Sequence, residues 1–315
     1  MTCQDAAYPE RLRQLKDLPL VLYGRGRQFR FDEELAIAMV GTRKCTPYGA
    51  SLAEKFGREL AQAGALVVSG IAQGIDSHAL RGALMGGGQV VSVLGGGIDV
   101  VYPRENQWLY EDVAAAGALI SEYPPGTETH GSHFPYRNRI ISGLTLGVLV
   151  VEAGSRSGAV ITAHHALDQG RDVFSVPGPL DAPQSAGTND IIGRGEARLV
   201  RNAQDILSEY ENNFPHKLRP LPPPPSRAAV RRPERAPRSE QPQAAAEEPP
   251  ELSLPVLPRS KLEDLGDEQQ EIFHLLSRRP LVPDQLVDCT GIPARRVNTA
   301  LPLLQAGGYI EELPG

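Results

Sequence analysis

The chain has 315 residues, of which 32 are basic and 38 acidic, and its formal net charge is −6. This balance excludes a wholly basic nucleic-acid-binding coat but permits a local basic groove, because binding depends on the phosphates neutralised at the site. No apolar run approaches the ~18 residues of a membrane span, and the N-terminus lacks the apolar core of a signal peptide, so we expect a cytoplasmic protein with no membrane contact.

The first two hundred residues alternate short apolar runs with glycine-rich turns and helical segments. The runs predicted as strands cover residues 36–40, 66–69, 90–94, 118–121, 147–151 and 172–176, and helices are expected from about Tyr48, up to Met85 and from Ala159 onward. Such alternation forms a mostly parallel sheet with right-handed crossovers, whose ligands bind outside the carboxyl ends of the strands. The sequence therefore predicts an α/β fold with an extended Rossmann-like domain.

Arginines accompany several of the predicted turns and make this edge a candidate anion site. Backbone N–H groups and the positive end of a helix dipole meet at a strand-to-helix turn, and arginines spread along an edge suit a phosphate chain better than one compact carboxylate. We expect Arg137, Arg139 and Arg156 to surround the strand at 147–151. The predicted binding residues are Gly41, Thr42, Arg43, Lys44, Gly70, Gly74, Phe134, Arg137, Asn138, Arg139, Ser155, Arg156, Ser157 and Gly158.

Neither a cofactor site nor a metal site is predicted. No turn has the G-x-G-x-x-G pattern followed by an acidic residue about 20 positions later, and no G-x-x-x-x-G-K-S/T phosphate loop is present, so ATP and NAD lack specific support. The three cysteines are far apart, and His78, His164 and His165 lack partners at ligand spacing.

Composition changes sharply after Phe214. Residues 215–260 are rich in Pro, Ala, Arg and Glu, as in a disordered or extended linker, and the first domain is therefore assigned to residues 1–214. Residues 261–315 are predicted to form a winged helix, with helices at 267–276 and 283–287, a third helix after Pro293 and a strand near Ile310. The third helix offers only Arg295, Arg296 and Asn298 to bases and is expected to be interrupted by Pro302, so both DNA and protein remain candidate partners of this module.

With these motifs in view, residues 8 to 210 resemble the bacterial DNA-processing protein A family, also called DprA or Smf. The resemblance rests on many ordered motifs, among them Val40-Gly41-Thr42-Arg43, Ser69-Gly70-x-Ala72-x-Gly74-Ile75-Asp76, Tyr102-Pro103, Ser121-Glu122-Tyr123-Pro124, Phe134-Pro135-x-Arg137-Asn138-Arg139 and Val151-Glu152-Ala153. Two features depart from the family pattern. We expect no counterpart of the N-terminal helical domain that many members have, and Glu196 stands where the family usually has Ala.

The resemblance implies a homodimer that binds single-stranded DNA and loads the RecA recombinase during natural transformation, helping RecA past single-strand-binding protein. It implies neither a catalytic step nor a cofactor, and it places the dimer contacts near the end of the Rossmann-like domain, where Ile191, Ile192 and Leu199 are the candidate surface. For single-stranded DNA, the arginines can contact phosphates, while Phe134 or Tyr136 can stack on bases.

Two alternatives come from other classes. A nucleotide-processing enzyme of the phosphoribohydrolase type would need a catalytic Glu just inside the helix after Gly158, but Ala159 and Val160 stand there, and Glu152 and Asp76 are the remaining acidic candidates. A sequence-specific regulator built on the winged helix lacks enough base-reading residues and leaves the large glycine-rich domain without a role.

Overall fold

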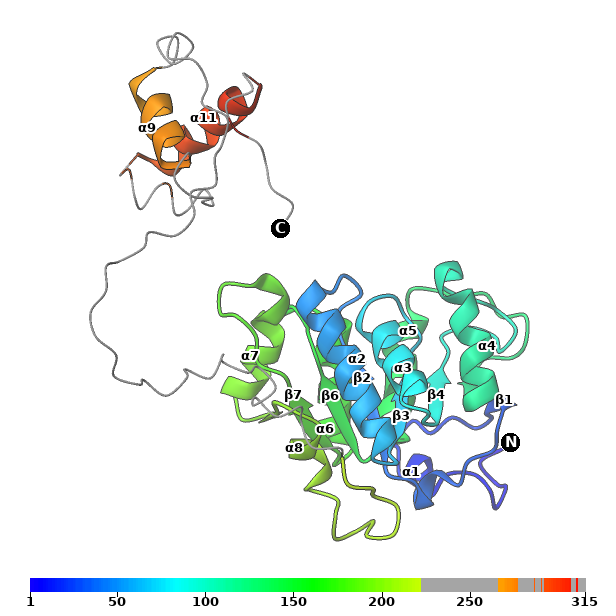
Figure 1. Cartoon of the computed structure of the whole chain (residues 1–315). Coiled ribbons are helices and arrows are strands. Elements are labelled where there is room, and N and C mark those ends of the chain that lie inside the picture. The colour runs from blue at the N-terminus through cyan, green and yellow to red at the C-terminus, as the bar shows by residue number, and fades with distance from the viewer. Residues whose placement is uncertain (222–265, 277–285, 287–289, 291, 307–309, 311–315) are drawn as a thin grey trace, which may run out of the picture. The chain divides into compact units, whose positions relative to one another are not determined.

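The computed structural model describes residues 1–221, 266–276, 286, 290, 292–306 and 310 (Figure 1). The chain separates into two compact units, Met1–Val230 and Arg231–Gly315. None of the helices within the described ranges is long and apolar enough to cross a membrane.

The first unit is built on one eight-stranded sheet with the order β1-β5-β4-β3-β2-β6-β7-β8. All neighbouring strands are parallel except β1 and β5, which confirms the predicted mostly parallel Rossmann-like sheet. Three predicted strands have the expected bounds, and those starting at 90, 147 and 172 end one residue early. The strands are β1 (Tyr23–Gly26), β2 (Ala36–Val40), β3 (Leu66–Ser69), β4 (Val90–Val93), β5 (Ala118–Ser121), β6 (Gly147–Val150), β7 (Asp172–Ser175) and β8 (Arg198–Leu199).

Helices cover both faces of this sheet. The α-helices of the first unit are α1 (Glu10–Arg13), α2 (Pro47–Gln62), α3 (Ile75–Met85), α4 (Gln107–Ala116), α5 (His133–Gly143), α6 (Gly158–Asp168), α7 (Ala186–Gly193) and α8 (Gln204–Leu207). Short 3₁₀ helices lie at Phe31–Glu33, Arg104–Asn106 and Pro183–Ser185. Thr46 caps α2 by accepting a hydrogen bond from Gly49 N–H, and Pro47 follows at the first helical position, where its missing N–H is not needed.

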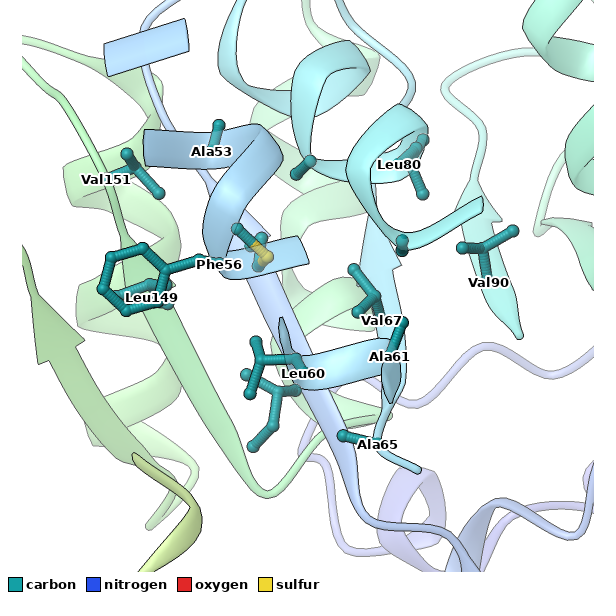
Figure 2. Close-up of a cluster of buried hydrophobic side chains, with 14 of the residues drawn as sticks. Ala53, Phe56, Leu60, Ala61, Ala65, Val67, Leu80, Val90, Leu149 and Val151 are labelled. Carbon is teal, nitrogen blue, oxygen red and sulfur yellow. The ribbon is translucent and has the colours of Figure 1, made fainter. Parts of the chain in front are cut away.

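The alternation of side chains along β2 divides the core into two layers. Ile37 and Met39 pack with residues of α2, α3 and α4, while Ala36, Ala38 and Val40 pack with residues of α1, α5 and α6. Figure 2 shows the first layer, in which Phe56 and Leu60 of α2 point onto the sheet among Val67, Leu80 and Leu149. Each buried side chain of this size contributes about 1.5–3 kcal/mol to stability.

Two glycines let α2 and α3 approach each other closely. A Cβ at Gly57 would lie 2.3 Å from the Ala79 carbonyl oxygen, and one at Gly82 would lie 2.2 Å from the Glu54 carbonyl oxygen. Any larger residue would push the two helices apart. The close packing, visible in Figure 1, also brings together the loops that precede the two helices.

The first unit continues past the expected boundary at residue 214. The Lys217 ammonium lies 2.9 Å from the Glu34 carboxylate, and Arg219 N–H donates to the Ala63 carbonyl oxygen at 2.9 Å. Leu218 and Leu221 pack against the core. The chain therefore stays on the first unit to residue 221.

The second unit has its own small core. Helices α9 (Asp267–Leu276) and α11 (Ala294–Ala306) contribute Ile272, Val297, Ala300 and Leu304, which pack with Leu286 and Ile292. The predicted interruption of the third helix is wrong, because α11 continues through Pro302. Most of the expected helix at 283–287 and the strand near residue 310 lie outside the described residues.

Candidate functional site

From β2 the chain adds β3, β4 and β5 on one side, and it then adds β6, β7 and β8 on the other side of β2. In folds of this kind, the usual ligand position is the crevice between the two strands at which the strand order reverses, here β2 and β6. Here Glu152, which is buried two residues after the end of β6, binds the loop after β2. Its Oε2 accepts from Thr46 N–H at 2.8 Å, and its Oε1 accepts from Thr46 Oγ1–H at 2.7 Å. A Cβ at Gly49 would lie 2.3 Å from Oε2. Glu152 therefore supports the start of α2 rather than facing an open crevice.

The loop between β2 and α2 is joined to the loop between β3 and α3. Ile75 N–H donates to the Thr42 carbonyl oxygen at 3.2 Å. Gly74 has a φ of 77°, and a Cβ there would lie 2.4 Å from that same oxygen and 2.6 Å from the carbonyl oxygen of Arg43. Only glycine suits this backbone and this separation. A Cβ at Gly41 would lie 2.4 Å from the Ile75 side chain, so the first turn also packs closely on the start of α3. These close contacts on either side of Arg43 fix its backbone position.

A pocket opens where these two loops meet the start of α5 and the segment before α4. Arg43, Gly70, Ala72, Gln73, Tyr102, Pro103 and Phe134 line it, and we call it the Arg43–Phe134 pocket. The guanidinium carbon of Arg43 lies 4.5 Å from the centre of the Phe134 ring, a cation–π distance. Arg43 is exposed and makes no hydrogen bond or ion pair with other described residues. Its N–H groups are therefore available to a ligand.

Arg137 lies beneath this pocket, in helix α5 rather than beside the strand as expected. Its buried guanidinium donates to the carbonyl oxygens of Gly70, at 3.1 Å, and Val93. Asp76 accepts from Gly70 N–H at 3.2 Å. Burial raises the pKa of Asp76 and lowers that of Arg137 to about 10, while the attraction between the two charges partly offsets both shifts. Arg137 is thus a buried cation behind the lining residue Gly70, and its hydrogen bonds are to the protein itself.

Arg139 and Asn138, also in α5, are directed into the protein as well. Arg139 is buried and forms a two-pronged ion pair with Glu122 at 2.7 and 3.0 Å, and its Nε–H donates to the Asp17 carbonyl oxygen at 2.8 Å. The Asn138 amide donates to the Gly158 carbonyl oxygen at 3.4 Å. These side chains tie α5 to its neighbours, so the expectation of free anion-binding groups at both positions is corrected.

The turn between β6 and α6 forms a second group of predicted residues. Ser155 and Arg156 are exposed, and the Ser157 hydroxyl accepts from Ala159 N–H at 3.3 Å and so caps α6. A Cβ at Gly158 would meet no atom within 4 Å. Because the pocket is formed by the loops after β2, β3 and β4, while β6 lies on the other side of β2, the predicted residues divide into two groups at one edge.

Tyr102 is a pocket residue that the predicted binding set lacked. It lies nine residues after β4. The rule that ligands bind at the carboxyl ends of parallel strands indicates only residues close to a strand end, so it did not point to Tyr102. The exposure of this residue, 46%, could be learned only from the structure. Among the described residues, no group of His, Cys, Asp and Glu could hold a metal ion.

The structure also separates the candidate dimer residues. Ile191 is only 1% exposed and packs in the core with α1, α5 and α6, so its assignment to a subunit surface is corrected. Leu199 is exposed on the edge strand β8, and Ile192 is partly buried. Glu196, the departure from the family pattern, lies 3.3 Å from His164 Nε2 of α6.

Comparison with known proteins gives two family matches. The family described as DNA recombination-mediator protein A matches residues 1–211, and the DprA winged helix domain matches residues 255–315. The DNA processing protein DprA of Bacillus subtilis is 41% identical over 64% of this chain and 68% of its own length. Protein Smf of Escherichia coli is 35% identical over 98% of this chain and 74% of its own length.

Solved structures agree with these matches. The X-ray structure of DprA from Streptococcus pneumoniae is 40% identical and superimposes with a TM-score of 0.64 over 66% of this chain and 73% of that chain. A structure of DNA processing protein A from Helicobacter pylori, described in terms of its single-stranded DNA binding mode, is 31% identical, with a TM-score of 0.60 over 65% of this chain and 93% of that chain.

Proposed function

Because the chain belongs to the DNA recombination-mediator protein A family, whose members are also named DprA or Smf, we propose that it binds single-stranded DNA at the Arg43–Phe134 pocket. As a homodimer it loads the RecA recombinase onto that strand in natural transformation and helps RecA past single-strand-binding protein. The observation that carries the DNA site is the exposed Arg43 guanidinium against the partly exposed Phe134 ring.

Single-stranded DNA requires cations along the phosphates and planar groups against the bases. Arg43 is positioned through its contact with Phe134, which leaves its N–H groups for a phosphate or a base edge. Arg137 adds positive potential from below although its own hydrogen bonds are to the protein. A phosphate and a base can therefore be bound side by side.

Further phosphates lie along the same edge in this proposal. Lys44 is exposed next to Arg43, and Ser155, Arg156 and Gly158 are exposed at the turn after β6. In this proposal the single-stranded DNA runs from the Arg43–Phe134 pocket, past the end of β2, to the second cationic turn after β6. Each neutralised phosphate lowers the logarithm of the binding constant by about 0.7 per decade of salt for single strands.

The proposed activity is binding rather than catalysis. None of the seven residues that line the pocket is Asp, Glu or His. Both oxygens of Glu152 accept hydrogen bonds from Thr46, and Asp76 is buried beside Arg137. A phosphoribohydrolase needs an acid or base within hydrogen-bond reach of its substrate, and these acidic groups serve the fold. Release of free base from nucleoside monophosphates would support the enzyme alternative instead.

The homodimer is proposed to use the edge at β8, with Leu199 at its centre and Ile192 beside it. A charge at the exposed Leu199 would be buried without a partner in such an interface. We expect Leu199→Glu to reduce the mass measured by light scattering from dimer to monomer while the melting temperature of the subunit is retained. An unchanged dimer mass would remove this surface from consideration.

The DNA proposal is tested with the full chain and labelled oligonucleotides in single- and double-stranded form. We expect preferential binding of the single strand and weakening as salt rises. Salt-insensitive binding would indicate a small-molecule pocket. Stronger binding of the duplex would contradict a site that stacks on unpaired bases.

A further inference from the structure

The outer wall of the Arg43–Phe134 pocket is an exposed tyrosine. The Tyr102 ring lies 5.5 Å from the Phe134 ring at an interplanar angle of 35°, and the residue as a whole is 46% exposed. A ring that is half open to water contributes little to a core. Beside a partly exposed phenylalanine, it extends the aromatic surface out of the pocket.

The backbone beneath this ring is firmly held. The buried Tyr110 hydroxyl accepts from Tyr102 N–H at 3.1 Å and donates to the Tyr102 carbonyl oxygen at 2.7 Å. The buried Asn106 amide donates to the Ile71 carbonyl oxygen at 2.9 Å, which ties the following 3₁₀ helix to the loop between β3 and α3. The backbone that carries the Tyr102 ring is therefore ordered before any ligand binds, and such preorganisation favours binding.

We propose that Tyr102 is a second base-stacking position, which takes the base next to the one held at the Arg43–Phe134 pocket. This inference rests on the proposed single-strand function and deepens it. Stacking on a tyrosine face accepts every base, which suits a protein that must bind DNA of any sequence. A stacking position at Tyr102 also defines a path for the single-stranded DNA. The path runs from the loop after β2, across the pocket and toward α4, where Arg104 is the next exposed cation.

The direct test compares two probes of equal length, an oligothymidylate and an abasic oligodeoxynucleotide that keeps the phosphates but has no bases. For Tyr102→Ala in the full chain, we expect a loss of about five- to hundredfold on oligothymidylate, the range of aromatic-to-alanine changes at stacked bases. On the abasic probe it should bind within about twofold of wild type, since phosphate contacts are unchanged. Because Tyr110 bonds to the backbone of residue 102, alanine keeps both hydrogen bonds and the fold.

Two variants serve as matched controls. Tyr102→Phe keeps the ring and should bind both probes as wild type does. The sequence offered Tyr136 as an alternative to Phe134 for stacking, but Phe134 lines the pocket and Tyr136 does not. Tyr136→Ala therefore removes an equally exposed tyrosine, 49%, from outside the pocket, where its ring lies 3.9 Å from the guanidinium carbon of Arg139. It should also bind both probes as wild type does.

The outcomes separate this inference from the proposed function. Arg43→Ala should weaken binding to both probes; if it weakens neither, the proposed DNA site fails. If Arg43→Ala weakens both while Tyr102→Ala matches wild type on oligothymidylate, the pocket stands and the second base position is refuted. Equal losses of Tyr102→Ala on both probes, or a loss confined to Tyr136→Ala, would also overturn the assignment of Tyr102.

Discussion

Replacing Arg139 with alanine should destabilise the first unit while leaving its DNA site in place. The guanidinium donates to both oxygens of Glu122 and to the carbonyl oxygen of Asp17, and its removal leaves a largely buried carboxylate without a partner. Breaking a buried pair on one side costs about 3–5 kcal/mol. Because the Glu122 side chain is still 20% exposed, we expect the lower end of that range, about 3 kcal/mol. For a domain of this size the melting temperature should fall by about 6–12 °C.

Trp108, the single tryptophan of the chain, lies in α4, so its fluorescence reports unfolding of the first unit. The matched control is Arg30→Ala, which removes an exposed pair with Glu33, with side chains 84% and 61% exposed, and should cost less than about 1 kcal/mol. Below the melting transition, Arg139→Ala should bind single-stranded DNA nearly as wild type does. An unchanged melting temperature together with lost binding would refute the structural role of Arg139.

Three further predictions concern the supports of the site. Glu152→Ala removes both acceptors of Thr46 and should lower the unfolding free energy by about 3 kcal/mol in urea titrations; unchanged stability would contradict its role at α2. Gly74→Ala places a Cβ 2.4 Å from the Thr42 carbonyl oxygen and should lower both the melting temperature and single-strand affinity, whereas wild-type binding would show that the junction of the two loops is dispensable. A truncation after Leu221 should keep most single-strand affinity, and its loss would place the main site in the second unit.

The sheet could be predicted because its signals are local. Apolar runs such as residues 66–69 end in glycine turns, and the close approach at Gly74 explains why a glycine stands there. The shared edge of these turns follows from parallel topology alone. The order of the strands, and therefore the separation of the two groups of predicted residues, depends on long-range pairing that the turns do not encode.

The burial of the α5 arginines could not be predicted from spacing. Seven consecutive residues from Arg137 to Gly143 are buried, polar and apolar alike, so this part of the helix has no solvent-exposed face and its sequence shows no 3.6-residue pattern. The groups that neutralise the arginines come from distant segments, Glu122 for Arg139 and Asp76 for Arg137. Without those partners in view, a cluster of arginines in the sequence resembles a free cationic surface.

The most direct test of the DNA site is the affinity of Arg43→Ala for a labelled single strand, measured beside its melting temperature. Loss of a charge-assisted contact worth about 1.5–3 kcal/mol should weaken binding about ten- to hundredfold. The melting temperature should stay within about 4 °C of the wild-type value, since Arg43 makes no hydrogen bond to other described residues and an exposed cation–π contact such as that with Phe134 is worth about 1 kcal/mol or less. Arg30→Ala, before β2 at the opposite edge of the sheet, should retain wild-type affinity. Wild-type affinity in a folded Arg43→Ala protein would contradict the assignment of single-stranded DNA to the Arg43–Phe134 pocket.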